Sequence, residues 1–279
     1  MDTNMARNGY GWIRRQLELL VSGCLLAAML PLAIAQEPAG DVPYIPTVLI
    51  TGANRGLGLE FTRQYVDRGW RVIATARRPE AADDLIALAG EHPGLVMIEK
   101  LDVQEFDAID ALSEKYADTP IDILINNAGI NGGARNQIFR KLQYEVYEDV
   151  LLTNTIAPLK MSEAFYDNLL AGQQKKIVTV SSSEGSIGSA TQARLYFYRS
   201  SKAAVNMVMV NLALQLKRRG ISVGMVNPGP TDTDFMAGLP KSMLRPPSDA
   251  VTDMIRNIDG LNLETTGTFW QYDGTTIPW

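Results

Sequence analysis

Short runs of Val, Ile and Leu recur along the chain from residue 47 onward, and stretches with a helical spacing of apolar residues lie between them. The runs are too continuous to alternate between apolar and polar positions, which is typical of strands buried on both faces. They predict seven strands, at Val48–Thr51, Arg71–Thr75, Leu95–Lys100, Ile121–Asn126, Lys176–Ser181, Ile221–Asn227 and Thr268–Tyr272. The intervening stretches predict helices near residues 57–68, 80–90, 105–117, 145–170 and 194–219, with a shorter one near 249–259.

A strand followed by a helix, repeated along the chain, requires crossover connections that make neighbouring strands parallel and place helices on both faces of the sheet. We therefore predict an α/β fold, a Rossmann-type doubly wound parallel sheet, formed by a single domain over residues 47–279. Ligands of such sheets bind beyond the carboxyl ends of the strands, so the turns that follow the strands are the expected places for binding residues.

The first 35 residues differ from the rest, because three arginines precede an apolar run from Leu17 to Ala35. This order is typical of a secretory signal peptide cleaved after Ala35. The run is also about long enough to span a bilayer, so an uncleaved membrane anchor is the alternative, with membrane contact only through residues 13–35. We expect an exported, periplasmic or membrane-anchored protein; a wrongly assigned start and a cytoplasmic location are the other alternative. Residues 36–46, with three prolines, read as a linker.

The composition excludes several classes of site. The formal net charge is −5 and no basic run is present, so nucleic acid is not an expected partner. One cysteine and one histidine leave no material for a disulfide framework or a Cys/His zinc site, and we expect no metal. Hydrophobic residues make up 46% of the chain, which supplies an ordinary globular core.

A glycine-rich turn follows the first predicted strand, where residues 51–58 read Thr-Gly-Ala-Asn-Arg-Gly-Leu-Gly and open a predicted helix. Glycines permit a tight turn there and let backbone N–H groups approach a pyrophosphate at the helix N-terminus. The Gly-x-x-x-Gly-x-Gly spacing differs from the Gly-x-Gly-x-x-Gly dinucleotide fingerprint and indicates another branch of the same fold. The turn predicts a nucleotide-binding loop.

Tyr198 and Lys202 are four residues apart in a predicted helix, so they lie on one face of it. A phenol has a pKa of roughly 10 in water, and a fixed ammonium nearby lowers that pKa toward neutral pH, which would make Tyr198 a general acid or base. The pair alone also fits two solvated surface residues. Its company favours chemistry: Asn-Asn-Ala-Gly at 126–129, three serines at 181–183 and Asn-Pro-Gly at 227–229 accompany it in a fixed order.

Together these motifs resemble those of the short-chain dehydrogenase/reductase family, and the likeness covers residues 47–279. Within the family, the ending over residues 267–279 looks like that of C-factor-like proteins and related carbonyl reductases. The resemblance implies hydride transfer between NADP(H) and a small-molecule carbonyl or alcohol substrate. A nucleotide-binding, C-factor-like signalling protein with little turnover is the alternative. A nucleotide-sugar epimerase is disfavoured, because the 77 residues after Lys202 leave little room for a substrate domain.

The resemblance assigns four catalytic residues, which are Asn154, Ser182, Tyr198 and Lys202. Tyr198 takes the general acid/base role, while Lys202 lowers its pKa and holds the nicotinamide ribose. Ser182 orients the substrate carbonyl, and the serines on either side of it are rival candidates. Asn154 links the lysine to a water relay, or is instead a buried helix residue bonded to backbone.

The resemblance also implies the cofactor contacts. The glycine-rich turn meets the pyrophosphate, the segment after the sixth strand meets the carboxamide and phosphates, and Asp102 meets the adenine ring unless it is a helix cap. The expected cofactor-binding residues are Gly52, Asn54, Arg55, Gly56, Leu57, Gly58, Arg77, Asp102, Asn126, Ala128, Gly129, Tyr198, Lys202, Pro228, Gly229, Thr231 and Thr233.

The end of the second predicted strand indicates which cofactor is bound. An NAD-selective site usually has an acidic residue there, which binds the ribose hydroxyls and repels a 2′-phosphate. That position is Ala76 in this chain, and the next residue, Arg77, together with Arg55 resembles family positions whose basic side chains flank the 2′-phosphate. Each arginine alone also fits a solvated surface charge. We expect NADP, with NADPH as the reductant.

Three further stretches bear on partners. The loops over Ser183–Arg194 and Phe235–Pro247 are expected to contact the substrate. Residues 206–212 read Asn-Met-Val-Met-Val-Asn-Leu, and more of their faces are apolar than one core requires. This favours a helix-to-helix surface of a homo-oligomer; the alternative is a helix buried on both sides.

Overall fold

The computed structural model describes residues 43–279. The predicted signal peptide or anchor over residues 1–35 and the linker up to residue 42 lie outside the described residues. Within residues 43–279, none of the helices combines the length and the apolar character that a bilayer-crossing segment needs.

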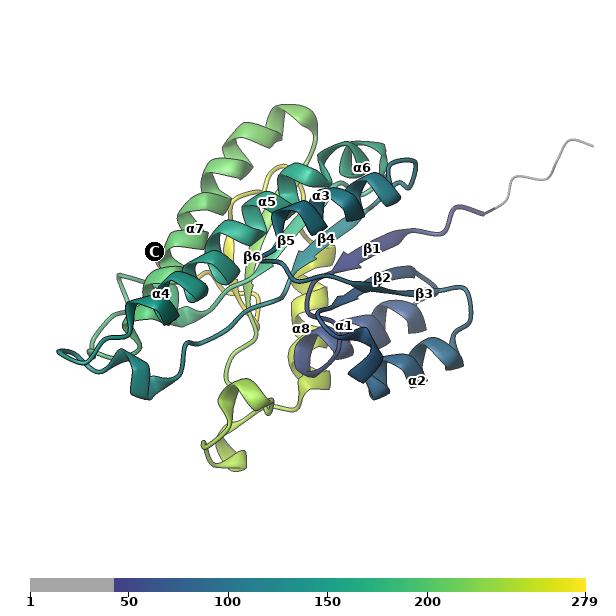
Figure 1. Cartoon of the computed structure of the whole chain (residues 1–279). Coiled ribbons are helices and arrows are strands. Elements are labelled where there is room, and N and C mark those ends of the chain that lie inside the picture. The colour runs from purple at the N-terminus through teal and green to yellow at the C-terminus, as the bar shows by residue number, and fades with distance from the viewer. Residues whose placement is uncertain (1–42) are drawn as a thin grey trace, which may run out of the picture. The chain divides into compact units, whose positions relative to one another are not determined.

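A seven-stranded sheet forms the centre of the compact unit, which runs from Tyr44 to Trp279 (Figure 1). Its strand order is β3-β2-β1-β4-β5-β6-β7, and every neighbouring pair is parallel. All seven predicted strands are therefore confirmed, and so is the doubly wound α/β fold. The strands are β1 (Thr47–Ile50), β2 (Arg71–Ala76), β3 (Val96–Lys100), β4 (Ile123–Asn126), β5 (Lys176–Val180), β6 (Ser222–Asn227) and β7 (Phe269–Gln271).

Helices cover both faces of this sheet, as crossover connections require (Figure 1). One face carries α1 (Gly56–Asp67), α2 (Asp83–Glu91) and α8 (Pro247–Asp259). The other face carries α3 (Phe106–Lys115), α5 (Ala157–Ala164), α6 (Tyr166–Ala171) and α7 (Tyr196–Leu216), and α4 (Tyr144–Leu151) precedes α5.

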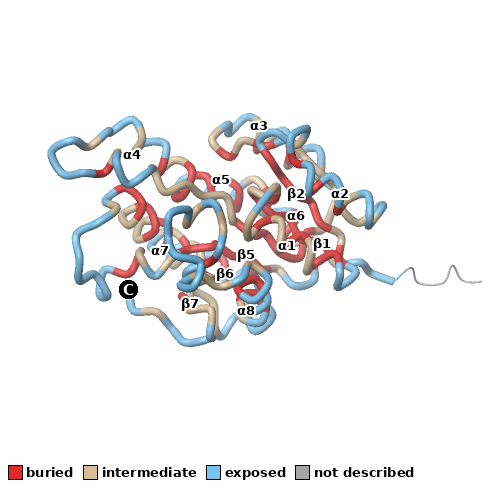
Figure 2. The backbone as a smooth tube through the Cα atoms, turned by 90° about the horizontal axis from the view of Figure 1, so that it is seen from below, coloured by how far each residue is buried: buried red, intermediate tan, exposed pale blue. Residues whose placement is uncertain are grey.

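Two hydrophobic layers result, one on each face of the sheet. Alternate residues of β1 enter different layers: Val48 and Ile50 pack with α1 and α8, whereas Leu49 packs with α5 and α7. Figure 2 shows the strands as the buried centre and the outer loops as exposed. Because each fully buried aliphatic side chain contributes roughly 1.5–3 kcal/mol, these layers hold the strand ends, and the turns that follow them, in fixed positions.

The prediction of one helix over residues 145–170 is wrong. The chain instead forms α4, a π-helical turn at Leu152–Ile156, and then α5 and α6, which are separated at Phe165. Pro158 lies in the first turn of α5 and has no N–H to donate to the carbonyl of Asn154, so the regular helical ladder is interrupted there. Asn154 lies inside the widened turn, a feature that often occurs at functional sites.

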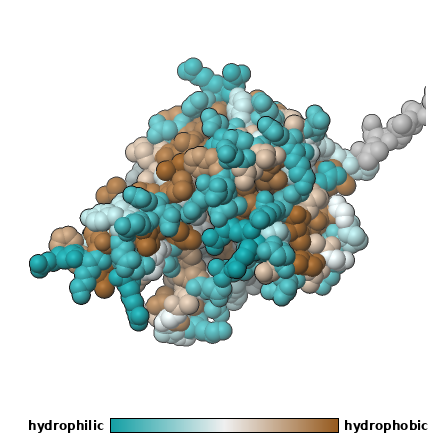
Figure 3. Space-filling model, in the orientation of Figure 1, coloured by the Kyte–Doolittle hydropathy of each residue, from teal (hydrophilic) through white to brown (hydrophobic). Residues whose placement is uncertain are grey.

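The apolar stretch of α7 has one buried face and one exposed face. Val205 and Met209 are in the core, whereas Met207 and Leu214 are 65% and 71% exposed. The alternative of a helix buried on both sides is therefore wrong. Figure 3 shows apolar surface over α5 and α7. The homo-oligomer itself stays a prediction.

A buried carboxylate fixes the start of the compact unit. Asp122 accepts hydrogen bonds from the Tyr44 hydroxyl at 2.7 Å and from the Thr47 backbone N–H at 2.8 Å, and its other oxygen accepts from two backbone N–H groups after α6. These bonds satisfy an otherwise costly buried charge. The segment from Tyr44 onward, which the sequence assigns to the linker, thus packs as part of the compact unit.

Candidate active site

The predicted site residues follow the carboxyl ends of the strands, so a parallel sheet brings them to one edge. β1 lies between β2 and β4 although β4 is three strands later in the chain. The strand order reverses at this point, and the connections after β1 and β4 leave toward opposite faces. A crevice between these connections is where doubly wound sheets bind ligands.

The glycine-rich turn connects β1 to α1. Gly52 and Gly56 have φ values of 66° and 53°, in the left-handed region that favours glycine. Gly58 has a different requirement, because a Cβ added there would lie 2.1 Å from the carbonyl oxygen of Gly52. The turn thus closes tightly against the first residues of α1, whose N-terminal N–H groups attract anions.

The turn after β4 clamps this loop. The Asn127 side-chain amide donates to the carbonyls of Thr51 and Gly52 at 2.9 and 3.1 Å. The backbone N–H groups of Asn127 and Ala128 each donate to the Thr51 hydroxyl at 3.0 Å. Thr51 and Asn127 lie inside the two motifs but were not among the predicted site residues; their polar side chains beside the glycines were the available signal.

Tyr198 and Lys202 meet on the buried face of α7, so the reading as a solvated surface pair is wrong. They are 8% and 5% exposed, and the Lys202 ammonium lies 5.8 Å from the centroid of the Tyr198 ring. The ammonium donates to the carbonyl oxygen of Val180 at 2.8 Å, at the end of β5. A hydrogen bond joins the Ser182 side chain to Tyr198.

Burial controls the proton affinity of this pair. It raises the pKa of Tyr198 to about 12, against a lowering by the hydrogen bond with Ser182, and the nearby charge of Glu184 raises it further. Burial also lowers the pKa of Lys202 to about 8. The prediction that Lys202 lowers the pKa of Tyr198 is therefore wrong for this structure. At neutral pH Tyr198 keeps its proton, which is the form that can donate.

The lowered pKa of Lys202 makes stability depend on pH. Between about pH 8 and the ordinary lysine pKa of 10.5, the unfolded chain binds the proton that the folded protein has lost, so stability rises with pH in this window. Urea unfolding of wild type and of Lys202→Met should show that the free energy of unfolding of wild type rises relative to the variant, by about 2 kcal/mol between pH 7 and pH 10. Parallel curves for the two proteins would contradict the burial of a charged Lys202.

Asn154 lies beside the turn after β4. Its side-chain amide donates to the carbonyl of Ile130 at 2.8 Å and to the Ser201 hydroxyl at 2.9 Å, and its oxygen accepts from the Ile130 N–H at 2.9 Å. A Cβ added at Gly129 would lie 3.3 Å from the Asn154 oxygen and 3.8 Å from the Lys202 ammonium. The structure therefore brings Asn154 and Lys202 to the two sides of Gly129, where both the relay role and the bonding to backbone are compatible with its contacts.

The three serines after β5 have different surroundings. Ser181 is buried and its hydroxyl donates to the Asn206 side chain at 2.6 Å, while Ser183 is exposed. Ser182 is half-buried, bonds with Tyr198, and accepts from the N–H of Glu184 at 3.2 Å. Of the three, Ser182 is the one whose hydroxyl faces the phenol.

The ends of β2 and β3 carry the residues expected at the adenosine. Arg77 is exposed directly after the buried Ala76. Asp102 is half-buried, and its carboxylate accepts from the N–H of Gln104 at 3.1 Å, so it stabilises the turn before α3. Arg55 is exposed as well and makes an ion pair of 2.9 Å with Asp234.

The segment after β6 folds back over the glycine-rich turn. Gly229 has a φ of 71°, and the Thr231 hydroxyl donates to its carbonyl at 3.1 Å. The Thr233 methyl lies 3.3 Å from the position of a Cβ on Gly56, so this segment contacts the start of α1. Phe235 places its ring 5.3 Å from that of Tyr198.

An arginine from just before α8 holds this segment in place. Arg245 donates from its side chain to the carbonyl of Pro228 at 3.1 Å, and its backbone N–H donates to the carbonyl of Pro230 at 2.8 Å. Its guanidinium also stacks 3.9 Å from the centroid of the Tyr272 ring and pairs with Asp253. Phe235 and Arg245 were not predicted site residues, and no local pattern in the sequence marks them.

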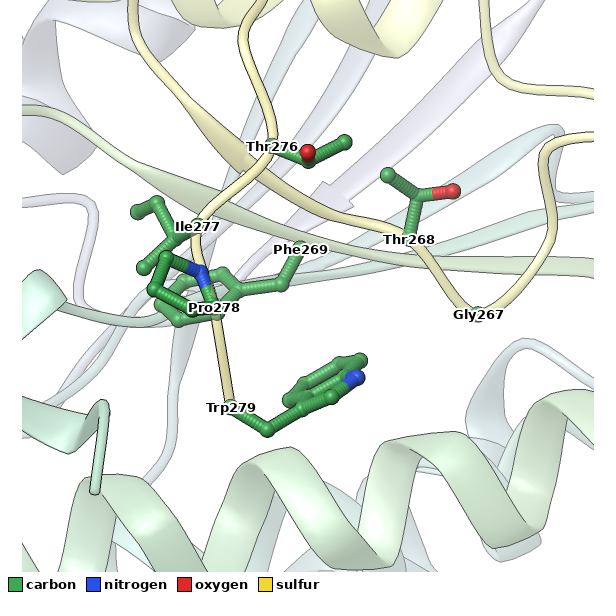
Figure 4. Close-up of a pocket in the computed structure, with 7 residues that line it drawn as sticks. All are labelled: Gly267, Thr268, Phe269, Thr276, Ile277, Pro278 and Trp279. Carbon is green, nitrogen blue, oxygen red and sulfur yellow. The ribbon is translucent and has the colours of Figure 1, made fainter. Parts of the chain in front are cut away.

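The loop between Ser182 and Tyr198 is held at two points. Glu184 forms ion pairs with Arg194 and Arg199, and the N–H of Gly188 donates to the carbonyl of Trp279 at 2.6 Å. Beside Trp279, Figure 4 shows a hollow of about 450 Å³, lined by Gly267, Thr268, Phe269, Thr276, Ile277, Pro278 and Trp279. None of the seven lining residues is a predicted site residue, so this hollow is not the candidate active site.

A comparison with known proteins decides the family. A sequence model described as short chain dehydrogenase matches residues 46–243, which is more than half of the chain. The chain belongs to the short-chain dehydrogenase family. Membership in this family of oxidoreductases accounts for the order of the motifs, from the glycine-rich turn to Tyr198 and Lys202.

Individual short-chain dehydrogenases show how far the similarity extends. The 1-hydroxy-2-glutathionyl-2-methyl-3-butene dehydrogenase of Rhodococcus sp. strain AD45 is 34% identical over 236 residues, 84% of this chain and 99% of the relative. The C-signal of Myxococcus xanthus is 37% identical over 163 residues, 57% of this chain and 93% of the relative. The NADPH-bound carbonyl reductase from chicken fatty liver superposes with a TM-score of 0.78 at 30% identity, covering 85% of this chain and all of that one.

In this short-chain dehydrogenase, residues 43–279 contain no group of three or more Asp, Glu, His or Cys side chains arranged to bind a metal ion. The polar groups at the carboxyl edge are instead hydroxyls, amides, one phenol and one ammonium. These groups donate hydrogen bonds and protons, which suits polarisation of an oxygen on a small molecule.

Proposed function

We propose that the protein is an NADPH-dependent carbonyl reductase in which Tyr198 is the proton donor. The observation that carries the proposal is the buried phenol of Tyr198, whose raised pKa keeps it protonated and whose hydroxyl bonds with Ser182. The same reaction in reverse oxidises an alcohol.

The residues present fit a dinucleotide cofactor. Gly58 leaves open the space that a Cβ would fill beside the carbonyl of Gly52, and α1 begins at Gly56 with its N–H groups toward that turn. Arg77 and Arg55 are both exposed near the ends of the strands where a 2′-phosphate would be bound, and no acidic residue occupies position 76. The NADPH of the chicken carbonyl reductase supports the same choice. When bound, the nicotinamide supplies the hydride.

The chain's own residues then handle the oxygen of the substrate. Tyr198 donates its phenolic proton to the carbonyl oxygen, and Ser182 donates a hydrogen bond to the same oxygen as negative charge develops on it. Lys202 places its positive charge behind the phenol ring. Asn154 fixes the turn that contains Gly129 and Ile130, next to the lysine.

A second candidate is a nucleotide-binding signalling protein with little turnover. The 37% identity to the C-signal of Myxococcus xanthus favours it. The complete set of Asn154, Ser182, Tyr198 and Lys202, gathered within contact of one another, favours turnover instead.

Titration of NADPH and NADH into the full-length protein, followed by NADPH oxidation with a panel of aldehydes and ketones, separates these functions. We expect NADPH to bind at least about 10-fold more tightly than NADH, equivalent to about 1.4 kcal/mol, and at least one carbonyl compound to be reduced. Equal dissociation constants would overturn the cofactor assignment. Tight NADPH binding without reduction of any carbonyl compound would favour the signalling protein.

A further inference from the structure

The helix that carries Tyr198 begins without a local cap. Leu195 occupies the N-cap position with a φ of 48°, in the left-handed region, and its side chain accepts no hydrogen bond from the helix. The first N–H groups of any α-helix have no partner within the helix and need an acceptor from elsewhere. In α7 these groups include the N–H of Phe197 and the N–H of Tyr198 itself.

The acceptor comes from a residue about 60 positions earlier in the chain. The side-chain oxygen of Gln137 accepts from the N–H of Phe197 at 2.8 Å and from the N–H of Tyr198 at 3.3 Å. These are the two positions that an ordinary N-cap side chain would serve. Gln137 is 4% exposed, so solvent does not substitute readily for it.

The other end of the same amide holds the segment that follows β4. The Gln137 nitrogen donates to the carbonyl of Asn131 at 2.6 Å and to the carbonyl of Gly133 at 3.2 Å. Asn131 in turn donates from its side chain to the carbonyl of Phe235, whose ring contacts Tyr198. One buried amide therefore joins the first turn of the catalytic helix to the segment that packs around the phenol.

We propose that Gln137 is a positioning residue for Tyr198, acting as the cap of α7 from outside the helix; this rests on the proposed reductase function. Tyr198 must place its hydroxyl within hydrogen-bond reach of the substrate oxygen, and misplacement by about 1 Å costs catalysis on the order of 100-fold. A neutral amide can both accept from the helix and donate to the loop, whereas a carboxylate would leave two buried carbonyls without a donor.

Removal of Gln137 should leave the helix folded, because Phe197 also stacks on Tyr147 with ring centroids 4.7 Å apart. The test is Gln137→Leu, which keeps a similar volume and removes both halves of the amide. The matched control is Asn168→Leu: Asn168 is a 4% exposed amide that donates to the carbonyls of Tyr116 and Thr119, beside the start of β4 at the other edge of the sheet.

Two readouts follow the variant. We expect kcat for carbonyl reduction to fall about 10-fold or more while KM for NADPH stays within about 3-fold, because the glycine-rich turn is untouched. Hydrogen exchange at the N–H of Phe197 and Tyr198 should become at least about 10-fold faster, since these N–H groups lose their acceptor. Asn168→Leu should change neither readout.

The inference is overturned if the two N–H groups exchange at the wild-type rate in Gln137→Leu, if kcat stays within about 2-fold of wild type, or if Asn168→Leu loses as much kcat. A wild-type protein that reduces no carbonyl compound would overturn the proposed function instead. In that case the exchange rates still decide: faster exchange at Phe197 and Tyr198 supports the cap, and unchanged exchange overturns it.

Discussion

Replacement of Tyr198 by Phe is expected to lower kcat for carbonyl reduction by about 100-fold or more. The substitution removes the transferable proton and keeps the ring, so the contact with Phe235 at 5.3 Å and the position of Lys202 should be retained. Since the tyrosine is 8% exposed, water has little access to replace its proton. The affinity for NADPH should therefore change little while turnover is lost.

Steady-state rates with the best carbonyl substrate, together with NADPH titrations, measure this effect. Tyr196→Phe is the matched control, because Tyr196 lies two residues earlier on α7 and is 43% exposed, with its ring near that of Phe139. The control should keep nearly wild-type turnover. A Tyr198→Phe protein that reduces its substrate at close to the wild-type rate would refute the proton-donor role.

The second large effect is expected from Arg77→Asp, which should reverse the preference between NADPH and NADH. Arg77 stands exposed at the end of β2, where an acidic residue would bind ribose hydroxyls and repel a 2′-phosphate. The substitution removes a guanidinium suited to phosphate and adds a negative charge, so the ratio of the two dissociation constants should change by about 100-fold. Arg55 adds less, because it is already paired with Asp234 on the surface.

Titration of both cofactors into wild type and Arg77→Asp gives the ratio directly. Arg78→Asp makes the same charge change one residue further along an exposed segment and serves as the control. It should alter the ratio far less than Arg77→Asp does. If the two variants shift the ratio equally, general surface charge rather than a contact of Arg77 would set the preference.

The strands were predictable because their apolar runs directly reflect burial on two faces. β4, for example, contributes Ile123, Leu124 and Ile125, all fully buried, and no surface position interrupts the run. The helical region near residues 145–170 was not predictable as it stands. Its apolar spacing fits one helix, and only the packing around Asn154 and Pro158 decides that the helix widens and restarts there.

The site was predictable where backbone geometry requires particular residues. Gly52, Gly56 and Gly58 each meet a positive φ or a close approach that other residues tolerate poorly. Gln137 was not predictable, because it contacts Phe197 and Tyr198 across about 60 residues of chain. No sequence pattern announces such a contact.

The protonation state of Tyr198 was also beyond the sequence. A lysine four residues away argues for a lowered pKa, but the outcome depends on how deeply both groups are buried. The structure buries them enough to raise the pKa of Tyr198 to about 12 and to lower that of Lys202 to about 8. Desolvation is a property of the whole fold and outweighs the local spacing.

Transfer of deuterium from NADPH tests the central claim most directly. The full-length protein is incubated with a reducible carbonyl compound and NADPH that carries deuterium on one or the other face of nicotinamide C4, and the product is analysed by mass spectrometry. Our account predicts that one of the two labelled cofactors places a single deuterium on the former carbonyl carbon of the product alcohol. Product alcohol without deuterium from either cofactor would contradict it.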